Sequence, residues 1–300
     1  MPSRWSKAWV MAATTRATGT IYIRVEVTNS CDNLTRFFRG LVARKLAIFN
    51  MKGGVGKSAT ATNLAVGLVR FKKKKVLLVD IDPQGTAGAS LGLQIWNLET
   101  QLKDILRNQS PDKLANLLSI AVTPTDTGVD ILPSNILLAV DEIAISSLPG
   151  RENLLKKSLA PIEQWYDFIV IDCPPNIGVF SINALKASDG VIVPVDMSYV
   201  GLLGVKGVEY AFTLVENFLE HQIYLVGVLA TRYDRRKNIS RDVLKSLQEH
   251  FSNHMFKTVI PDTVKISEAP SYGISIFEHD SNGAGAKAYK DLVNEVLKRW

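Results

Sequence analysis

Residues 50–58 carry the residue types that bind the phosphates of a nucleoside triphosphate. They read N-M-K-G-G-V-G-K-S. The three glycines allow the backbone to turn its N–H groups toward phosphate oxygens, Lys57 supplies a cation for the terminal phosphates, and the Ser58 hydroxyl can ligate Mg2+. A nucleoside triphosphate and Mg2+ are therefore the predicted ligands. The residues predicted to bind them in this loop are Lys52, Gly53, Gly54, Val55, Gly56, Lys57, Ser58 and Ala59.

The same loop contains a second lysine, Lys52, although one lysine is enough to hold a triphosphate. The usual pattern G-x-x-x-x-G-K-[ST] has glycine at the position of Met51, so this loop departs from it while keeping the groups that contact phosphate. Taken alone, a lysine at a loop entrance is a solvated residue. Beside this glycine loop that interpretation is disfavoured, and the loop chemistry alone assigns Lys52 no role.

Two carboxylates are placed to serve magnesium and hydrolysis. Asp172 ends the apolar run F-I-V-I-D, the position of an aspartate that holds Mg2+, usually through water. Asp82 lies in the turn D-I-D-P-Q-G, where a carboxylate beside the phosphates can orient or deprotonate the attacking water. The alternatives are a helix cap for Asp172 and a turn-forming aspartate before proline for Asp82. We predict Asp82, with Lys52 and Lys57, as the catalytic residues.

Apolar runs alternate with amphipathic stretches from Lys45 onward. We expect strands at residues 45–50, 76–80, 129–132, 168–172, 191–195 and 223–231, and helices across 58–71, 98–119, 136–145, 151–162, 201–218 and 283–300. Runs such as F-I-V-I-D are apolar throughout, as strands with helices on both faces are. The predicted fold class is α/β: a doubly wound, mostly parallel sheet whose ligand binds beyond the carboxyl ends of the strands.

Composition limits the other classes of function. Residues 1–44 hold seven basic and two acidic residues, so they account for five of the six net positive charges of the chain. We expect a basic N-terminal extension of unassigned function at residues 1–43 and one domain at 44–300. Two cysteines, Cys31 and Cys173, exclude a disulfide scaffold and a C-x-x-C metal site, and favour a reducing cytoplasm. No apolar run approaches the roughly 18 to 20 residues that span a bilayer.

Five segments together resemble the ParA partitioning ATPases of the deviant Walker-A (ParA/MinD) superfamily of P-loop NTPases. They are K-G-G-V-G-K-S, D-I-D-P-Q-G-T, F-I-V-I-D-C-P-P, S-I-N-A-L-K-A-S-D-G-V-I-V-P-V and I-P-D-T-V-K-I-S-E-A-P-S-Y-G. They occur in the order typical of the family, and the resemblance covers the chain from about Lys45 onward. It implies a weak, partner-stimulated, Mg2+-dependent ATP hydrolase that is cytoplasmic and associated with the nucleoid.

The resemblance also implies roles for single residues. Two ATP-bound subunits face each other, and Lys52 reaches the phosphates of the partner's nucleotide, so ATP binding is coupled to dimerisation. Lys57 binds the β- and γ-phosphates within its own subunit, Ser58 and Asp172 serve Mg2+, and Asp82 activates water. The implied partners are a second copy of the chain, nonspecific duplex DNA and a ParB-type adaptor, and the cargo is recognised through the adaptor.

A basic segment is the predicted DNA-binding surface. Residues 231–241 contain five basic residues and one acid, Asp234. The family places DNA-contacting cations at Arg235, Arg236 and Lys265. Asp262 stands where relatives often have arginine, which weakens the patch, and a solvated loop is the alternative. The residues predicted to bind DNA are Arg235, Arg236, Lys237, Arg241 and Lys265. The run Lys72–Lys75 is interpreted as structural, because cations complement the end of a helix.

Other branches of the superfamily fit less well. Nitrogenase iron proteins need cluster-ligating cysteines that this chain lacks. A membrane-surface positioning ATPase of the MinD type is the main alternative, but the chain stops at Lys298-Arg299-Trp300, directly after a helix expected to pack on the fold, so no stable membrane insertion is predicted. A third interpretation, a regulator that binds DNA through residues 1–44, is not supported by any helix-turn-helix pattern.

Overall fold

The computed structural model describes residues 43–300, except for the side chains of residues 200, 202–205, 214, 218 and 219. The predicted N-terminal extension, residues 1–43, lies outside the described residues apart from Ala43. In the described part of the chain, no helix is long and apolar enough to cross a membrane.

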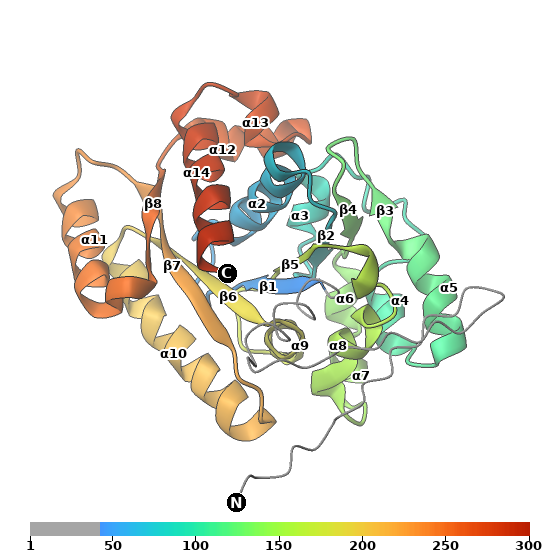
Figure 1. The fold of residues 1–300 in the computed structure, drawn as a ribbon. Coiled ribbons are helices and arrows are strands. Elements are labelled where there is room, and N and C mark those ends of the chain that lie inside the picture. Colours follow the sequence, from blue (N-terminus) through green and yellow to red (C-terminus); the bar gives the residue numbers. More distant parts are fainter. Residues whose placement is uncertain (1–42) are drawn as a thin grey trace, which may run out of the picture. The chain divides into compact units, whose positions relative to one another are not determined.

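Within residues 43–300, eight strands form one sheet in the order β3-β4-β2-β5-β1-β6-β7-β8 (Figure 1). The strands are β1 (Arg44–Ile48), β2 (Val76–Asp80), β3 (Thr123–Pro124), β4 (Asp130–Leu132), β5 (Phe168–Asp172), β6 (Gly190–Asp196), β7 (Tyr224–Tyr233) and β8 (Met255–Pro261). Only the two-residue β3 at one edge runs antiparallel to its neighbour; the other pairs are parallel. The predicted fold class is confirmed.

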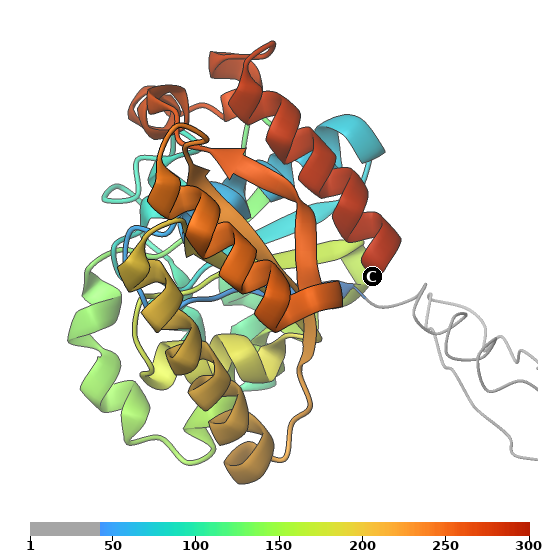
Figure 2. The ribbon, with the colours of Figure 1, turned by 90° about the vertical axis from the view of Figure 1, so that its left-hand side faces the viewer.

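The helices cover both faces of this sheet because successive strand residues point to opposite sides. The helices are α2 (Lys57–Lys72), α3 (Thr86–Ala89), α4 (Leu102–Arg107), α5 (Pro111–Ala121), α6 (Leu137–Val140), α7 (Glu142–Ser146), α8 (Leu154–Leu159), α9 (Val179–Ala187), α10 (Tyr199–Leu219), α11 (Asn238–Phe251), α12 (Val264–Glu268), α13 (Ile276–His279) and α14 (Ala284–Arg299). In β1, Leu46 and Ile48 pack in the hydrophobic cluster that contains α2 and α14. Ala47 of β1 and Phe49, which follows the strand, pack in a second cluster that contains α8 to α11. Figures 1 and 2 show α14 and α10 on opposite faces.

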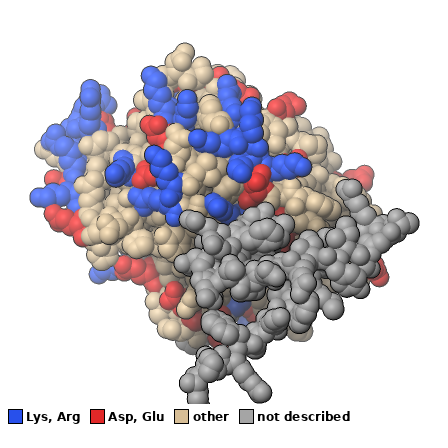
Figure 3. Space-filling model, in the orientation of Figure 1, with Lys and Arg blue, Asp and Glu red and all other residues tan. Residues whose placement is uncertain are grey.

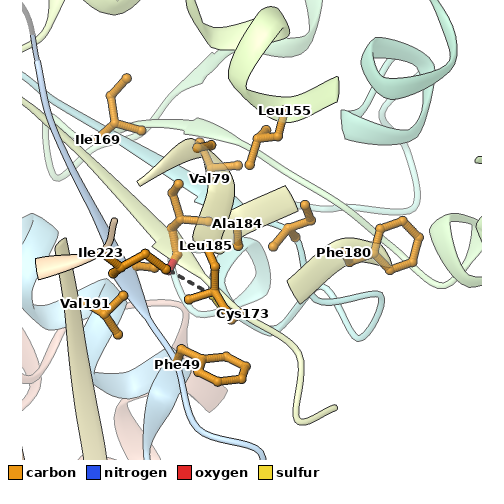
Figure 4. Close-up of a cluster of buried hydrophobic side chains, with 14 of the residues drawn as sticks. Phe49, Val79, Leu155, Ile169, Cys173, Phe180, Ala184, Leu185, Val191 and Ile223 are labelled. Carbon is orange, nitrogen blue, oxygen red and sulfur yellow. Dashed lines mark hydrogen bonds between the residues drawn. The ribbon is translucent and has the colours of Figure 1, made fainter. Parts of the chain in front are cut away.

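Figure 4 shows the second cluster at close range. It contains Phe49, which directly follows β1, together with Val79 and Ile169 of the strands and Phe180 of α9. Cys173 is fully buried in this cluster, and its thiol lies 3.8 Å from the carbonyl oxygen of Ile171. Burial raises the pKa of Cys173 well above its usual range, followed in importance by the charge of Asp172. The thiol is therefore a core group, and the described residues hold no cluster of three or more His, Cys, Asp or Glu side chains placed to bind a metal ion.

Several predicted elements differ from the structure. The helical stretch expected across 98–119 is divided into α4 and α5, because Pro111 begins a new helix and cannot continue the preceding one. The stretch expected at 136–145 is divided into α6 and α7, and only 154–159 of the stretch at 151–162 is α-helical. Strand β8 was not predicted, because polar Lys257 and Thr258 interrupt its apolar run at the sheet edge.

The sheet order brings three functional loops together. Strands β2, β5 and β1 are neighbours, and their last residues lie side by side, with Asp172 paired with both Ile48 and Asp80. The loops that follow these strands therefore meet at the carboxyl edge of the sheet, as predicted for the ligand site.

Candidate nucleotide-binding site

The phosphate loop follows β1 and ends in the N-terminus of α2. Gly54 and Gly56 have φ values of +73° and +85°, in the left-handed region that favours glycine. Gly56 is the N-cap of α2 and no side chain caps the helix, so the first N–H groups of a 16-residue helix remain available for an anion. The neighbouring strands brace the loop: the Thr231 hydroxyl donates to the carbonyl of Val55 at 2.8 Å, and the Asn50 amide donates to that of Pro194 at 2.7 Å.

Lys57 lies at the centre of the site. Its side chain is buried and its ammonium donates to the backbone carbonyl of Lys52 at 3.0 Å. Burial lowers the pKa of Lys57, and the nearby carboxylate of Asp172 is the largest opposing influence. The lysine is thus positioned by a single neutral acceptor, which leaves two of its three protons for a ligand.

Asp172 is the residue whose environment most calls for a cation. Its side chain is completely buried, and among residues 43–300 no group forms a hydrogen bond of normal geometry with either carboxylate oxygen, although the Ser58 hydroxyl lies close enough to influence it. Burial raises the pKa of Asp172 to about 7, with the charge of Asp82 adding to the rise, while the Ser58 hydroxyl and the Lys57 ammonium oppose it. A buried carboxylate without partners is unfavourable unless a cation or proton compensates it. Asp172 and Ser58 therefore fit Mg2+ as a bound group.

Asp80 and Asp82 have different environments in the loop after β2. Asp80 is fully buried and accepts from the amides of Ala87 and Gly88 at 2.9 and 3.1 Å, so it anchors the start of α3. Burial, followed by the charge of Asp172, raises the pKa of Asp80 well above its usual range. Asp82 is 8% exposed and accepts from the amide of Gln84 at 2.9 Å. Asp80 is thus a structural residue, and Asp82 is the more accessible carboxylate at this edge.

Lys52 has partners that the sequence did not predict. Its ammonium donates to both carboxylate oxygens of Asp196 at 2.7 and 2.9 Å, and to the hydroxyl of Ser198 at 3.2 Å. Asp196 ends β6, which is the neighbour of β1 on the side away from β5. An aspartate at the carboxyl end of an apolar strand, as in V-I-V-P-V-D, is the signal that could have identified it.

The comparisons with known proteins identify the family of the chain. The chain matches the AAA domain family over residues 43–225. It is 41% identical over 251 residues to the sporulation initiation inhibitor protein Soj of Bacillus subtilis, covering 84% of this chain and 97% of that protein. It is 35% identical over 259 residues to the chromosome partitioning protein ParA of Myxococcus xanthus, covering 86% of this chain and 89% of that protein. The chain is a ParA-type P-loop ATPase.

Solved structures share the fold of this ParA-type ATPase. A cobyrinic acid a,c-diamide synthase of Mycobacterium smegmatis with bound ATP analogue and magnesium is 32% identical, with a TM-score of 0.74, and the match covers 86% of this chain and 96% of that one. A plasmid partition protein of Borrelia burgdorferi, 24% identical with a TM-score of 0.66, has the same fold and is covered along its whole length.

In this ParA-type ATPase, most of the predicted DNA-binding cations already have acidic partners. The Arg236 guanidinium donates to both oxygens of Asp234 at 2.9 Å and, through these hydrogen bonds, holds the pKa of Asp234 well below its usual range. The ammonium of Lys237 lies 3.5 Å from Asp262, and Lys265 lies 2.9 Å from Glu268. The Lys237 contact links the segment after β7 with the segment that leads to α12.

The remaining two predicted cations are less constrained. Among the described residues, Arg235 and Arg241 form no ion pair, and Arg241 donates to the side chain of Asn238. Arg232, for which no role in DNA binding is predicted, donates to the carbonyl of Gly54 at 3.4 Å and so contacts the phosphate loop. Only Arg235 and Arg241 of the predicted patch are therefore available without breaking an ion pair.

A second basic surface lies over α2 and α14, where Figure 3 shows Lys and Arg side chains gathered. It includes Arg70, which is exposed at the end of α2, and Lys287 and Lys290 of α14. Arg70 and Lys290 both lie over the ring of Phe71, with distances of 5.9 and 5.1 Å to its centroid. In the run Lys72–Lys75, Lys74 pairs with Asp167 at 3.2 Å, as a structural role predicts.

Proposed function

We propose that this protein is an ATP-dependent dimerising switch that binds nonspecific duplex DNA in its ATP-bound form and, with a ParB-type adaptor, partitions or positions a cargo. The sequence relatives named for chromosome partitioning support the general role. The proposal that the protein dimerises depends on Lys52, a second cation in the phosphate loop that already contains Lys57. Because the proposed ligand is chromosomal or plasmid DNA, the proposed location of the protein is the cytoplasm, in association with the nucleoid.

ATP and Mg2+ are the proposed cofactors, and the site residues fit both. The N-terminus of α2 and the loop glycines offer backbone N–H groups to the phosphates, and Lys57 offers a buried ammonium. Ser58 and Asp172 would hold Mg2+, which when bound neutralises phosphate charge. The Mycobacterium smegmatis relative with ATP analogue and magnesium supports this assignment.

Asp82 is the proposed group that orients or deprotonates the attacking water. Asp82 lies on the loop after β2, at the carboxyl edge of the sheet, and its charge acts on Lys57 of the phosphate loop, which supports this role. The hydrogen bond from the Gln84 amide orients the carboxylate, and the Ser134 hydroxyl fixes the backbone of Asp82 at 2.6 Å. Hydrolysis then ends the ATP-bound state, and the adaptor is expected to accelerate this step.

DNA binding is tested with Asp82→Ala protein, in which ATP should persist. We expect ATP-loaded Asp82→Ala protein to bind a labelled duplex of random sequence at low salt more tightly than the ADP-loaded form, as measured by fluorescence anisotropy. Equal affinity of the two forms would contradict the proposal. ATP-dependent co-sedimentation with liposomes in place of DNA would favour the membrane-surface alternative.

The DNA-binding residues are tested by removing the two unpaired cations. In Arg235→Ala/Arg241→Ala, log affinity should fall less steeply with log salt. The magnitude of the slope should decrease by about 0.9 for each phosphate that is no longer neutralised, and we expect roughly two such phosphates per subunit. Lys287→Ala/Lys290→Ala is the matched control, since it removes two exposed cations of α14 outside the predicted patch. A larger loss of binding in the α14 variant than in the arginine variant would place the DNA surface over α2 and α14.

A further inference from the structure

Every proton of the Lys52 ammonium is used within its own subunit. The ammonium has three N–H donors, and they meet the two oxygens of Asp196 and the hydroxyl of Ser198 at 2.7, 2.9 and 3.2 Å. Lys57, by comparison, donates to one backbone carbonyl, and no carboxylate of the described residues lies within hydrogen-bond distance of it. The two lysines of the loop therefore differ: Lys57 is available to a ligand, whereas Lys52 is fully engaged.

The partners of Lys52 are themselves fixed. The Ser198 hydroxyl donates to Asp196 at 2.7 Å, and it accepts from the amide of Gly201 at 3.1 Å as the N-cap of α10. The side chains of Lys52 and Asp196 are 25% and 14% exposed, so the ion pair is partly shielded from solvent and salt. The end of β6 and the start of α10 thus form a preorganised receptor for the Lys52 ammonium.

We propose that Asp196 and Ser198 form a latch that holds Lys52 in its own subunit and opposes ATP-dependent dimerisation. The inference rests on the proposed function, in which Lys52 contacts the phosphates of the partner's nucleotide. Lys52 cannot make that contact with protons that it gives to Asp196 and Ser198. Dimerisation must therefore exchange the Asp196 carboxylate for a phosphate as the partner of Lys52.

The exchange has a free-energy consequence that favours the separate subunits. When Lys52 leaves, Asp196 remains as a partly buried carboxylate without its counter-ion, which is unfavourable. A ligand shifts an equilibrium only by its difference in affinity for the two states, so the phosphates must bind Lys52 better than the latch does. Asp196 consequently raises the protein concentration at which ATP produces dimers. It is a positioning residue and does not touch the nucleotide.

The test measures dimerisation by sedimentation over a range of protein concentrations, with ATP or ADP. In Asp196→Asn, which keeps the shape of the side chain but removes its charge, the dissociation constant of the ATP dimer should fall about tenfold, within the usual range of coupling between sites. Asp196→Glu, which restores a carboxylate, should return toward the parent value. A fall that is equally large in Asp196→Glu would contradict a latch based on charge.

The matched control is Asp189→Asn, the same substitution immediately before the other end of β6. Asp189 lies 3.8 Å from the ammonium of Lys45 and accepts from the Lys45 amide at 2.9 Å. It faces a lysine but lies at the opposite edge of the sheet from the nucleotide site. Its dimer dissociation constant should equal that of the parent, and a tenfold fall there would show that net charge alone is responsible.

A second measurement reports the latch without requiring dimers. In nucleotide-free protein, an amine-acylating reagent should modify Lys52 several-fold faster in Asp196→Asn than in the parent, as followed by peptide mass spectrometry. If ATP dimerises the parent but Asp196→Asn changes neither dimerisation nor acylation, the latch is wrong. If the parent stays monomeric on ATP, the proposed dimerisation is wrong. The regulatory role of the latch is then also wrong, even if acylation shows that Asp196 contacts Lys52.

Discussion

The nucleotide edge and the basic segment after β7 both concentrate charge, but they hold it differently. At the nucleotide edge, Lys57 and Asp172 are buried, and within the described part of the chain no hydrogen bond of normal geometry reaches the Asp172 carboxylate. In the basic segment, the Arg236 side chain is 85% exposed and pairs with its neighbour Asp234. At the nucleotide edge, the buried charged groups are thus available to a ligand. In the basic segment, most charged side chains form ion pairs with one another and are exposed to solvent.

This difference indicates different kinds of binding. Buried groups interact strongly, because no water competes for them, and their removal leaves a partner uncompensated. Exposed ion pairs contribute little to stability and are weakened by salt. We therefore expect the nucleotide edge to tolerate few substitutions, and the basic segment to respond in a graded way that depends on ionic strength.

The largest expected effect is the loss of ATP binding in Lys57→Ala. Removing one partner of a buried charge interaction weakens binding by about 2 to 5 kcal/mol, and Lys57 is buried beside the predicted phosphate position. Titration calorimetry with ATP and Mg2+ measures the change. Lys103→Ala removes a lysine that pairs with Asp104, away from the site, and should bind ATP as the parent does. If Lys57→Ala bound ATP as tightly as the parent, the buried charge at the nucleotide edge would not contribute to ligand binding, and the contrast with the basic segment would be wrong.

The second effect is on stability as a function of pH, through Asp172. Its pKa is raised to about 7 in the folded protein from 3.8. The folded protein keeps this proton to higher pH than the unfolded chain does, so the free energy of unfolding falls as pH rises from about 4 to about 7. Asp172→Asn should reduce that fall by up to about 4 kcal/mol.

Urea unfolding in buffers with EDTA, between pH 4 and pH 8, measures this dependence. A residual fall is expected in the variant, because burial and the charge of Asp172 also raise the pKa of Asp80, and Asp80 keeps its burial after the substitution. Identical pH profiles for Asp172→Asn and the parent would show that the carboxylate is compensated in the folded protein, as it is in the basic segment.

A smaller effect separates the glycines of the phosphate loop. Gly56→Ala places a side chain at φ +85°, which should lower the free energy of unfolding by about 1 to 2 kcal/mol. Gly53 lies outside the left-handed region, and a Cβ there would meet only Pro175 at an ordinary 3.9 Å. Gly53→Ala is thus the control, with a change of less than about 0.5 kcal/mol in thermal or urea unfolding. Equal changes in both variants would indicate that backbone conformation does not distinguish them.

The sequence predicted the nucleotide edge better than the basic segment for a physical reason. The apolar runs of β1 and β2 lead into the phosphate loop and the turn that contains Asp82, and β5 ends in Asp172, so local patterns locate Lys57 and Asp172. The order of the sheet then brings those ends together, as the rules for parallel sheets require.

What the sequence did not predict depends on contacts between distant residues. The partner of Lys52 lies 144 positions away in Asp196, and Lys237 meets Asp262 only because β7 and β8 are neighbours. The sequence also did not predict β8, an edge strand that contains the polar residues Lys257 and Thr258. The backbone amides of these two residues donate to the Glu295 carboxylate of α14, a contact between distant parts of the chain. Local patterns specify where a charge stands in the chain, but not which opposite charge will meet it.

The smallest expected effect comes from releasing a cation in the basic segment. Asp234→Asn removes the carboxylate that holds Arg236, so affinity for duplex DNA at low salt should rise about threefold and its salt dependence should steepen by about one neutralised phosphate. Asp242→Asn changes net charge equally in the next helix, but within the described residues Asp242 holds no cation in an ion pair. A rise confined to Asp234→Asn means that internal pairing limits this surface. Equal rises in both variants mean that only net charge matters, and that the contrast with the nucleotide edge is one of exposure alone.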